Sequence, residues 1–209
     1  RFVQALAEIW GEPAASQFTV FVFVSMLAYS AQDLILEPFA GATFGYSPGE
    51  STQLAGIQHG GAFVGMLFAA IAGRRVAGRP AGSVRGWAIG GCIASAVALL
   101  GLVVAGLSPD TWPLKLNVFF LGMANGAFAI AAIASMMRLA SVGRASREGV
   151  RMGLWGAAQA IAFGLGGVAG AAASDVARWF IDSAGSAYGL VFGLEAVLFL
   201  VSAWLAAGI

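Results

Sequence analysis

Residues 28–56 read AYSAQDLILEPFAGATFGYSPGESTQLAG, and they interrupt a chain that is otherwise very apolar. The runs on either side, 17–36 and 54–73, each match the roughly 20 apolar residues that a helix needs to cross a bilayer. Proline restricts the continuation of a helix, and glycine permits tight turns. The stretch therefore predicts two membrane-spanning helices joined by an outer turn, with the first helix stopped by Pro38 and the second capped by Ser47 or Ser51.

The composition extends this interpretation to the whole chain. Of the 209 residues, 59% are hydrophobic and only 10% are charged, whereas a soluble domain carries about 25% charged residues. The apolar runs are continuous rather than alternating, which excludes a β-barrel, and backbone groups in lipid have to pair within their own segment. We therefore expect an all-α, polytopic membrane protein with a cytoplasmic lead-in at 1–16 and six transmembrane helices, at about 17–36, 54–73, 86–107, 117–137, 152–174 and 187–208.

The basic residues predict the orientation in the membrane. Two alternate loops hold eight of the eleven Lys and Arg residues: Arg74, Arg75, Arg79, Arg85, Arg138, Arg144, Arg147 and Arg151. The positive-inside rule places these loops, and with them both ends of the chain, in the cytoplasm. A net charge of +1 leaves no broad basic surface, so we expect membrane lipid and no nucleic acid as a partner.

The order of spans and basic loops suggests two related triplets of helices. Six spans with both ends on one side, and basic loops three spans apart, are the arrangement of one half of a major-facilitator-like fold, which is a 3+3 inverted repeat. The loop AGRRVAGRP at 72–80 has the position and charge of the basic loop of that fold. It lacks the acidic residue that this loop usually carries.

Small residues four apart recur along the spans. The pairs are Gly56/Gly60, Gly61/Gly65, Gly86/Gly90, Gly122/Gly126, Gly166/Gly170 and Gly189/Gly193. Such spacing lets helix backbones touch inside a bilayer, where lipid supplies no hydrophobic drive for association. Most of these glycines are expected to pack the bundle tightly, and a minority to open a groove for a flat ligand or a partner helix.

A family resemblance is carried by the outer turn. The motif consists of Gln32-Asp33, then Leu36-Glu37-Pro38-Phe39 with Gly41, then Ser51-Thr52-Gln53-Leu54. It resembles the C-terminal half of the PucC/LhaA family, and the last span, from Tyr188, is also similar to that of the family. Ala40 before Gly41 and Ser51 before Thr52 are mild departures from the pattern of the family.

The resemblance implies a function and a set of partners. PucC/LhaA proteins are facilitator-fold proteins of photosynthetic bacteria that assist light-harvesting complex assembly and are associated with delivery of bacteriochlorophyll. The implied cofactor is bacteriochlorophyll, and the implied place is the bacterial inner (photosynthetic intracytoplasmic) membrane. The implied partners are antenna polypeptides, a reaction-centre–antenna complex and an N-terminal half of the same chain. The motif residues that would contact pigment or partner are Gln32, Asp33, Glu37, Pro38, Gly41 and Thr52.

Two further residues are candidates because of their chemistry. Glu195 lies about a third of the way into the last span, where a carboxylate is expected to be protonated, paired or lining a cavity. It could bind a pigment carbonyl or a partner helix, couple protons, or simply bond a neighbouring helix. His59 is a candidate axial ligand for the magnesium of bacteriochlorophyll, or a residue that bonds a backbone carbonyl. Asn117 could bond across helices, and Phe120 could stack on a macrocycle.

No catalytic constellation is apparent in the sequence. There is no P-loop and no histidine near a plausible nucleophile, so we expect a protein that is not an enzyme. The alternative function is a proton-coupled major-facilitator secondary transporter of a small solute, for which Asp33 and Glu195 are the motivation. The spans offer few polar residues, which speaks against a hydrophilic substrate. A scaffold bundle without a ligand is the third possibility.

Overall fold

The computed structural model describes residues 2–73, 75–76, 79–80, 83–141 and 147–209. In these ranges the chain is helical apart from one short antiparallel ribbon, in which Arg75 lies opposite Pro80. Six of the helices are long and apolar enough to cross a bilayer, so the protein is a multi-pass membrane protein, as predicted. The elements are α1 (Phe2–Trp10), α2 (Pro13–Phe44), α3 (Pro48–Ala72), β1 (Arg75–Val76), β2 (Arg79–Pro80), α4 (Val84–Leu107), α5 (Leu114–Ser141), α6 (Glu148–Phe180) and α7 (Ala184–Ala207).

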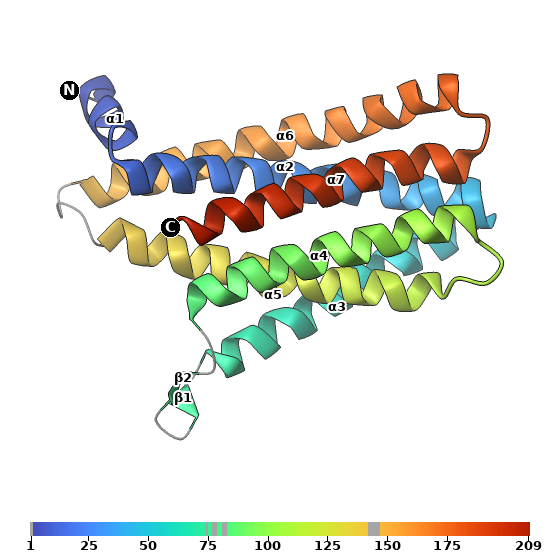
Figure 1. Cartoon of the computed structure of the whole chain (residues 1–209), viewed down its shortest axis with the longest axis horizontal. Helices are drawn as coiled ribbons and strands as arrows, with labels where there is room; N and C mark the ends of the chain where they lie inside the picture. Colours follow the sequence, from blue (N-terminus) through green and yellow to red (C-terminus); the bar gives the residue numbers. More distant parts are fainter. Residues whose placement is uncertain (1, 74, 77–78, 81–82, 142–146) are drawn as a thin grey trace.

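The six long helices run side by side in two layers (Figure 1). One layer contains α2, α6 and α7, and the other contains α3, α4 and α5. Both termini lie toward the end of the bundle that carries β1 and β2, and the connections α2–α3, α4–α5 and α6–α7 lie at the opposite end. An even number of crossings requires this placement of the termini.

The contacts between helices follow a pattern that relates the triplet α2–α4 to the triplet α5–α7. The most extensive contacts are α3 with α5, α4 with α7, α2 with α6, α4 with α5, and α2 with α7. Suppose that α2 is exchanged with α5, α3 with α6, and α4 with α7. The α2–α6 pair then becomes the α5–α3 pair, and the α2–α7 pair becomes the α5–α4 pair. The α4–α7 pair is converted into itself. An inverted 3+3 repeat requires such a pattern of pairs, while the relation to the major facilitator fold stays a prediction.

The first outer turn differs from its prediction at one residue. Pro38 does not stop the first helix, because α2 continues through it to Phe44. A proline inside a membrane helix removes one backbone hydrogen bond, and its surroundings can compensate for this loss. The helix ends instead at Gly45, whose φ of 69° is left-handed. The Gly45 N–H donates to the Gly41 carbonyl at 3.1 Å, and the Tyr46 N–H donates to the Ala40 carbonyl at 3.4 Å.

The capping prediction for the second helix is confirmed. Ser47 is the N-cap of α3, and its side-chain oxygen accepts a hydrogen bond from the Glu50 N–H at 3.4 Å. The Glu50 carboxylate in turn accepts one from the Ser47 N–H at 2.8 Å. This reciprocal capping box fixes the start of α3 directly after the turn.

Glycines bring the backbones of α3 and α5 into direct contact. A Cβ atom added at any of four positions would lie 2.0–2.2 Å from a carbonyl oxygen of the facing helix, far inside van der Waals contact. The positions are Gly61 and Gly65 on α3 and Gly122 and Gly126 on α5. Two of the predicted small-residue pairs therefore hold these helices together, as expected for association inside lipid.

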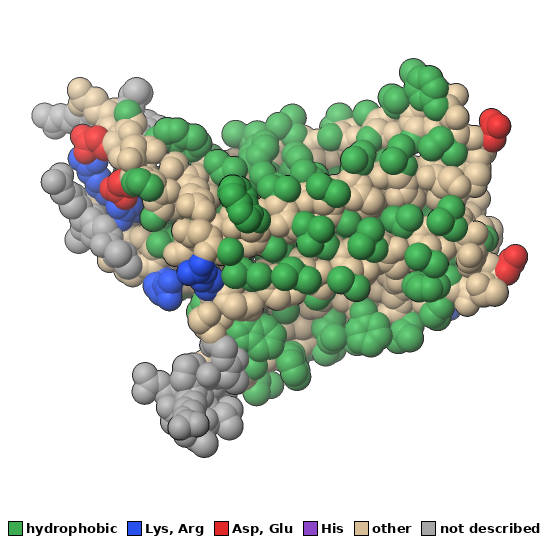
Figure 2. Space-filling view, in the orientation of Figure 1, with side chains coloured by type: hydrophobic (Ala, Val, Ile, Leu, Met, Phe, Trp, Pro, Cys, Tyr) green, Lys and Arg blue, Asp and Glu red, His purple; other side chains and the backbone are tan. Residues whose placement is uncertain are grey.

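Charged side chains gather at the two ends of the bundle (Figure 2). At the end with both termini, Arg147 pairs with Glu8 and Arg151 with Glu12, so that α1 and the start of α2 are tied to the start of α6. The other end shows acidic side chains. This separation agrees with the positive-inside prediction, although Arg74 and Arg144 lie outside the described residues and the orientation itself stays a prediction.

Candidate functional site

The predicted site residues on α2 lie on two different faces of that helix. Gln32 is buried in the bundle with 1% of its side chain exposed, and neither its amide oxygen nor its amide nitrogen has a hydrogen-bond partner among the described residues. Asp33, Glu37 and Pro38 are exposed on the outside of the bundle, and Gly41 is half-buried. The motif is thus not a single cluster, because its residues face opposite sides of one helix.

The two predicted site residues on α3 are exposed and bonded to their own helix. The Thr52 hydroxyl donates to the Pro48 carbonyl at 2.9 Å. The His59 Nδ1 lies 2.7 Å from the Ala55 carbonyl oxygen, which leaves Nε2 as the ring nitrogen that points away from the helix backbone. The proposal that His59 binds magnesium stays a prediction.

Glu195 is buried within the bundle. Its side chain on α7 is 2% exposed, and neither carboxylate oxygen has a hydrogen-bond partner in the described part of the chain. Helix α7 packs on α2, the helix that carries Gln32. The bundle therefore contains two unpaired polar side chains on neighbouring helices, at a place where unpaired polar groups are expensive.

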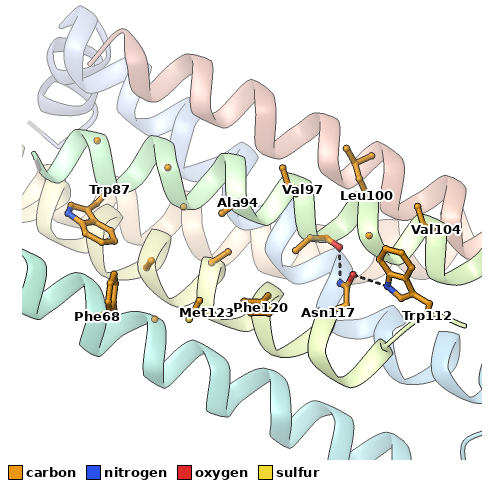
Figure 3. Close-up of a pocket in the computed structure, with 18 residues that line it drawn as sticks. Phe68, Trp87, Ala94, Val97, Leu100, Val104, Trp112, Asn117, Phe120 and Met123 are labelled. Carbon is orange, nitrogen blue, oxygen red and sulfur yellow. Dashed lines mark hydrogen bonds between the residues drawn. The ribbon is translucent and has the colours of Figure 1, made fainter.

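A large cavity among the described residues is a groove between α3 and α4, which we call the α3–α4 groove (Figure 3). Helices α3 and α4 each pack on α5 and diverge from one another, so α5 forms the floor between them. The groove has a volume of about 1100 Å³, above the range of about 300–1,000 Å³ for most ligand pockets. It is lined by Gly65, Phe68, Gly86, Trp87, Gly90, Gly91, Ala94, Val97, Ala98, Leu100, Gly101, Val104, Trp112, Asn117, Phe120, Met123, Ala124 and Ala127.

Small residues of α4 keep one half of the groove open. Gly86, Gly90 and Ala94 are four residues apart, which places them on one face of the helix. A Cβ atom added at Gly90 would meet no atom within 4 Å. The predicted Gly86/Gly90 pair therefore opens a groove instead of joining two helices.

Aromatic residues lie at both ends of the groove. Near the end that carries β1 and β2, the rings of Phe68 and Trp87 meet edge to face, with centroids 6.0 Å apart and planes at 69°. At the other end the Trp112 Nε1 donates to the Asn117 Oδ1 at 3.1 Å, and the Asn117 Nδ2 donates to the Ala98 carbonyl at 2.9 Å. Gly101 makes room for this contact, because a Cβ atom there would lie 2.1 Å from the Asn117 Oδ1.

The dimensions and polarity of the groove suit a long, uncharged molecule. Its lining on α4 runs from Gly86 to Val104. The 18 helical steps between these residues, at 1.5 Å each, span about 27 Å, close to the roughly 30 Å hydrocarbon thickness of a bilayer. No charged side chain lines it among the described residues. In the same part of the chain, no three His, Cys, Asp or Glu side chains gather into a metal-binding group.

The groove and the predicted site residues do not coincide. None of Gln32, Asp33, Glu37, Pro38, Gly41, Thr52, His59 and Glu195 lines it. Sequence reasoning did not place Trp87 or Trp112 in a binding site, although the Gly86/Gly90 spacing, Asn117 and Phe120 were signals for this region. The fold was needed to show that these residues share one cavity.

Comparisons with known proteins agree in pointing to one family. The model of the family described as PUCC protein matches residues 1–209. The chain is 52% identical over 209 residues, 100% of its length and 48% of the relative, to "Bacteriochlorophyll synthase 44.5 kDa chain" of Rhodobacter capsulatus. It is 28% identical over 207 residues, 96% of its length and 43% of the relative, to "Protein PucC" of the same organism. It thus spans less than half the length of these curated relatives. Because the match covers the whole chain, the chain belongs to the PucC family.

Proposed function

We propose that this protein assists the assembly of photosynthetic light-harvesting complexes by binding bacteriochlorophyll in the α3–α4 groove and delivering it to antenna polypeptides. Family membership and the name of the relative "Bacteriochlorophyll synthase 44.5 kDa chain" support a role in the biogenesis of bacteriochlorophyll or of photosynthetic complexes. The proposed place is the bacterial inner membrane, in its photosynthetic intracytoplasmic part, with both ends of the chain cytoplasmic.

The observation that carries the proposal is the groove itself. Bacteriochlorophyll combines a flat ring with a long hydrocarbon chain, and the groove is apolar, large, and nearly as long as the bilayer is thick. No described histidine lines the groove, so retention there would rest on shape and apolar contact rather than on magnesium ligation. An open side toward lipid would let pigment enter and leave without crossing the bundle.

We expect Ala94→Trp to reduce the bound pigment about tenfold or more, because an indole in the middle of the groove would occupy the space that a ligand needs. The measurement is the near-infrared absorption of the protein gently purified from pigmented cells. The matched control is Ile93→Trp, at the adjacent residue, which is 44% exposed and does not line the groove. Full pigment retention in Ala94→Trp would remove the groove from the proposal, and repeated isolation of the parent without pigment would contradict binding altogether.

A proton-coupled secondary transporter is the second candidate function, and the observation that favours it is the buried, unpaired carboxyl group of Glu195. We expect Glu195→Gln to leave pigment content and antenna assembly unchanged, because the amide keeps the size of the side chain. A transporter would instead lose substrate-dependent proton uptake in liposomes. Substrate-dependent proton uptake by the parent that Glu195→Gln abolishes would support transport, whereas a parent without such uptake would contradict it.

A further inference from the structure

The two halves of the α3–α4 groove differ in shape. In the half near β1 and β2, Gly86 and Gly90 leave the backbone of α4 exposed, and the rings of Phe68 and Trp87 border this area. In the other half, the branched side chains of Val97, Leu100 and Val104 line the same face of α4 (Figure 3). A wall of exposed backbone suits a flat ring system with aromatic edges beside it, whereas a wall of branched aliphatic side chains suits a single chain.

The polar groups in the groove are already engaged. Asn117 uses its oxygen for Trp112 and its nitrogen for the Ala98 carbonyl. No lysine, arginine or histidine lines the groove among the described residues, so none of them would neutralise an anionic ligand. A carboxylate placed there would lose its hydration without gaining a counter-ion, which is unfavourable inside a membrane.

We infer that the groove selects the esterified, chain-bearing form of its pigment and rejects the free acid, with the ring in the glycine half and the chain in the aliphatic half. This inference rests on the proposed function, and it names the chemical form of the ligand. The selection does not come from hydrophobic burial, because a chain in lipid is already out of water. The selection comes from two sources. The hydrocarbon chain of the pigment fits along the side chains from Val97 to Val104, and the groove offers no partner for a carboxylate.

The test compares two forms of one pigment at matched concentrations in the bilayer. The protein is placed in nanodiscs of uncharged lipid and titrated with bacteriochlorophyll a and, separately, with the free acid obtained by hydrolysing its chain ester, while pigment fluorescence is followed. We expect the ester to bind about tenfold or more tightly than the acid, given the cost of a charge in this environment. Equal affinities of the two forms would overturn the inference.

Two variants test which half of the groove holds the ring of the pigment and which half holds its hydrocarbon chain. Gly90→Leu adds a side chain to the glycine-lined wall of α4 and is expected to weaken the binding of both forms of the pigment. Val104→Trp narrows the aliphatic half and is expected to weaken the ester while leaving the acid unchanged. Ile93→Trp serves again as the control outside the groove. An unchanged ester affinity in Val104→Trp would overturn the placement of the chain.

Failure of this inference and failure of the proposed function give different results. If neither form binds, pigment binding and the inference both fail. If both forms bind equally and Gly90→Leu weakens both, pigment binding in the groove stands and the selection fails. If the ester binds selectively but cells carrying Ala94→Trp assemble antenna complexes normally, the selection stands and delivery from the groove fails.

Discussion

Gly126→Ala is expected to destabilise the helix bundle by about 3 kcal/mol, at the upper end of the usual cost of overpacking, because this contact leaves no room for adjustment. A Cβ atom at Gly126 would lie 2.0 Å from the Ala62 carbonyl oxygen and 2.7 Å from its carbon. No side-chain rotation relieves a clash between a Cβ atom and a backbone, so α5 and α3 would have to separate. The measurement is the free energy of unfolding in mixed micelles, together with the yield of monodisperse protein.

Gly60→Ala is the matched control for this change. Gly60 lies on α3 close to the same contact, but its added Cβ atom would meet nothing within 4 Å. There the substitution is expected to be neutral or to stabilise the protein by up to about 1 kcal/mol, through the higher helix propensity of alanine. Equal stability of Gly126→Ala and the parent protein would contradict the direct backbone contact of α3 and α5.

The α3–α5 contact also determines the shape of the groove. Gly65 belongs both to that contact and to the groove lining. Separation of α3 from α5 would therefore change the floor and one wall of the groove together. A glycine substitution at the contact is expected to lower pigment retention even in molecules that still fold, whereas Gly60→Ala is not.

Much of the fold could be predicted from the sequence, because membrane-spanning helices depend on local composition. Length and apolarity were sufficient to predict six spans, and Ser47 with Glu50 was sufficient to predict a cap. The end of α2 was predicted wrongly at Pro38, because in soluble helices proline is a reliable stop while a membrane helix tolerates it. Gly45, the residue that ends α2, is one of several glycines in the turn, and only its φ distinguishes it.

The candidate site could be predicted only in part. The small-residue spacing at Gly86/Gly90 has the same appearance in the sequence as that at Gly122/Gly126, yet one pair faces an open groove and the other a neighbouring backbone. What differs is the partner helix, which depends on long-range packing. The polar motif on α2 was easier to see, because charges are rare in this chain, but its residues point to opposite sides of the helix.

Trp155→Ala is expected to destabilise the protein by about 3 kcal/mol, at the lower end of the range for a buried tryptophan. The substitution leaves a cavity and removes packing contacts, as it would in a soluble protein. In lipid, however, burial of the side chain does not remove it from water, so that contribution to stability is absent. Trp155 on α6 is fully buried and lies edge to face on Phe18 of α2, with ring centroids 4.9 Å apart. Its Nε1 donates to the Thr19 hydroxyl at 3.1 Å, and that hydroxyl donates to the Ala15 carbonyl at 2.7 Å. The substitution therefore removes a ring from the α2–α6 contact and leaves the Thr19 oxygen without its donor.

Two further variants separate packing from hydrogen bonding at this position. Trp155→Phe keeps most of the ring volume and is expected to lose about 1 kcal/mol, the usual net value of one hydrogen bond. Trp204→Ala removes the same side chain from a surface position on α7, where it is 74% exposed, and is expected to leave the free energy of unfolding within about 0.5 kcal/mol of the parent. Equal losses of unfolding free energy in Trp155→Ala and Trp204→Ala, measured in the same micelles, would show that α6 does not pack on α2 through Trp155. The α2–α6 contact would then no longer support the pairing of the first triplet of helices with the second.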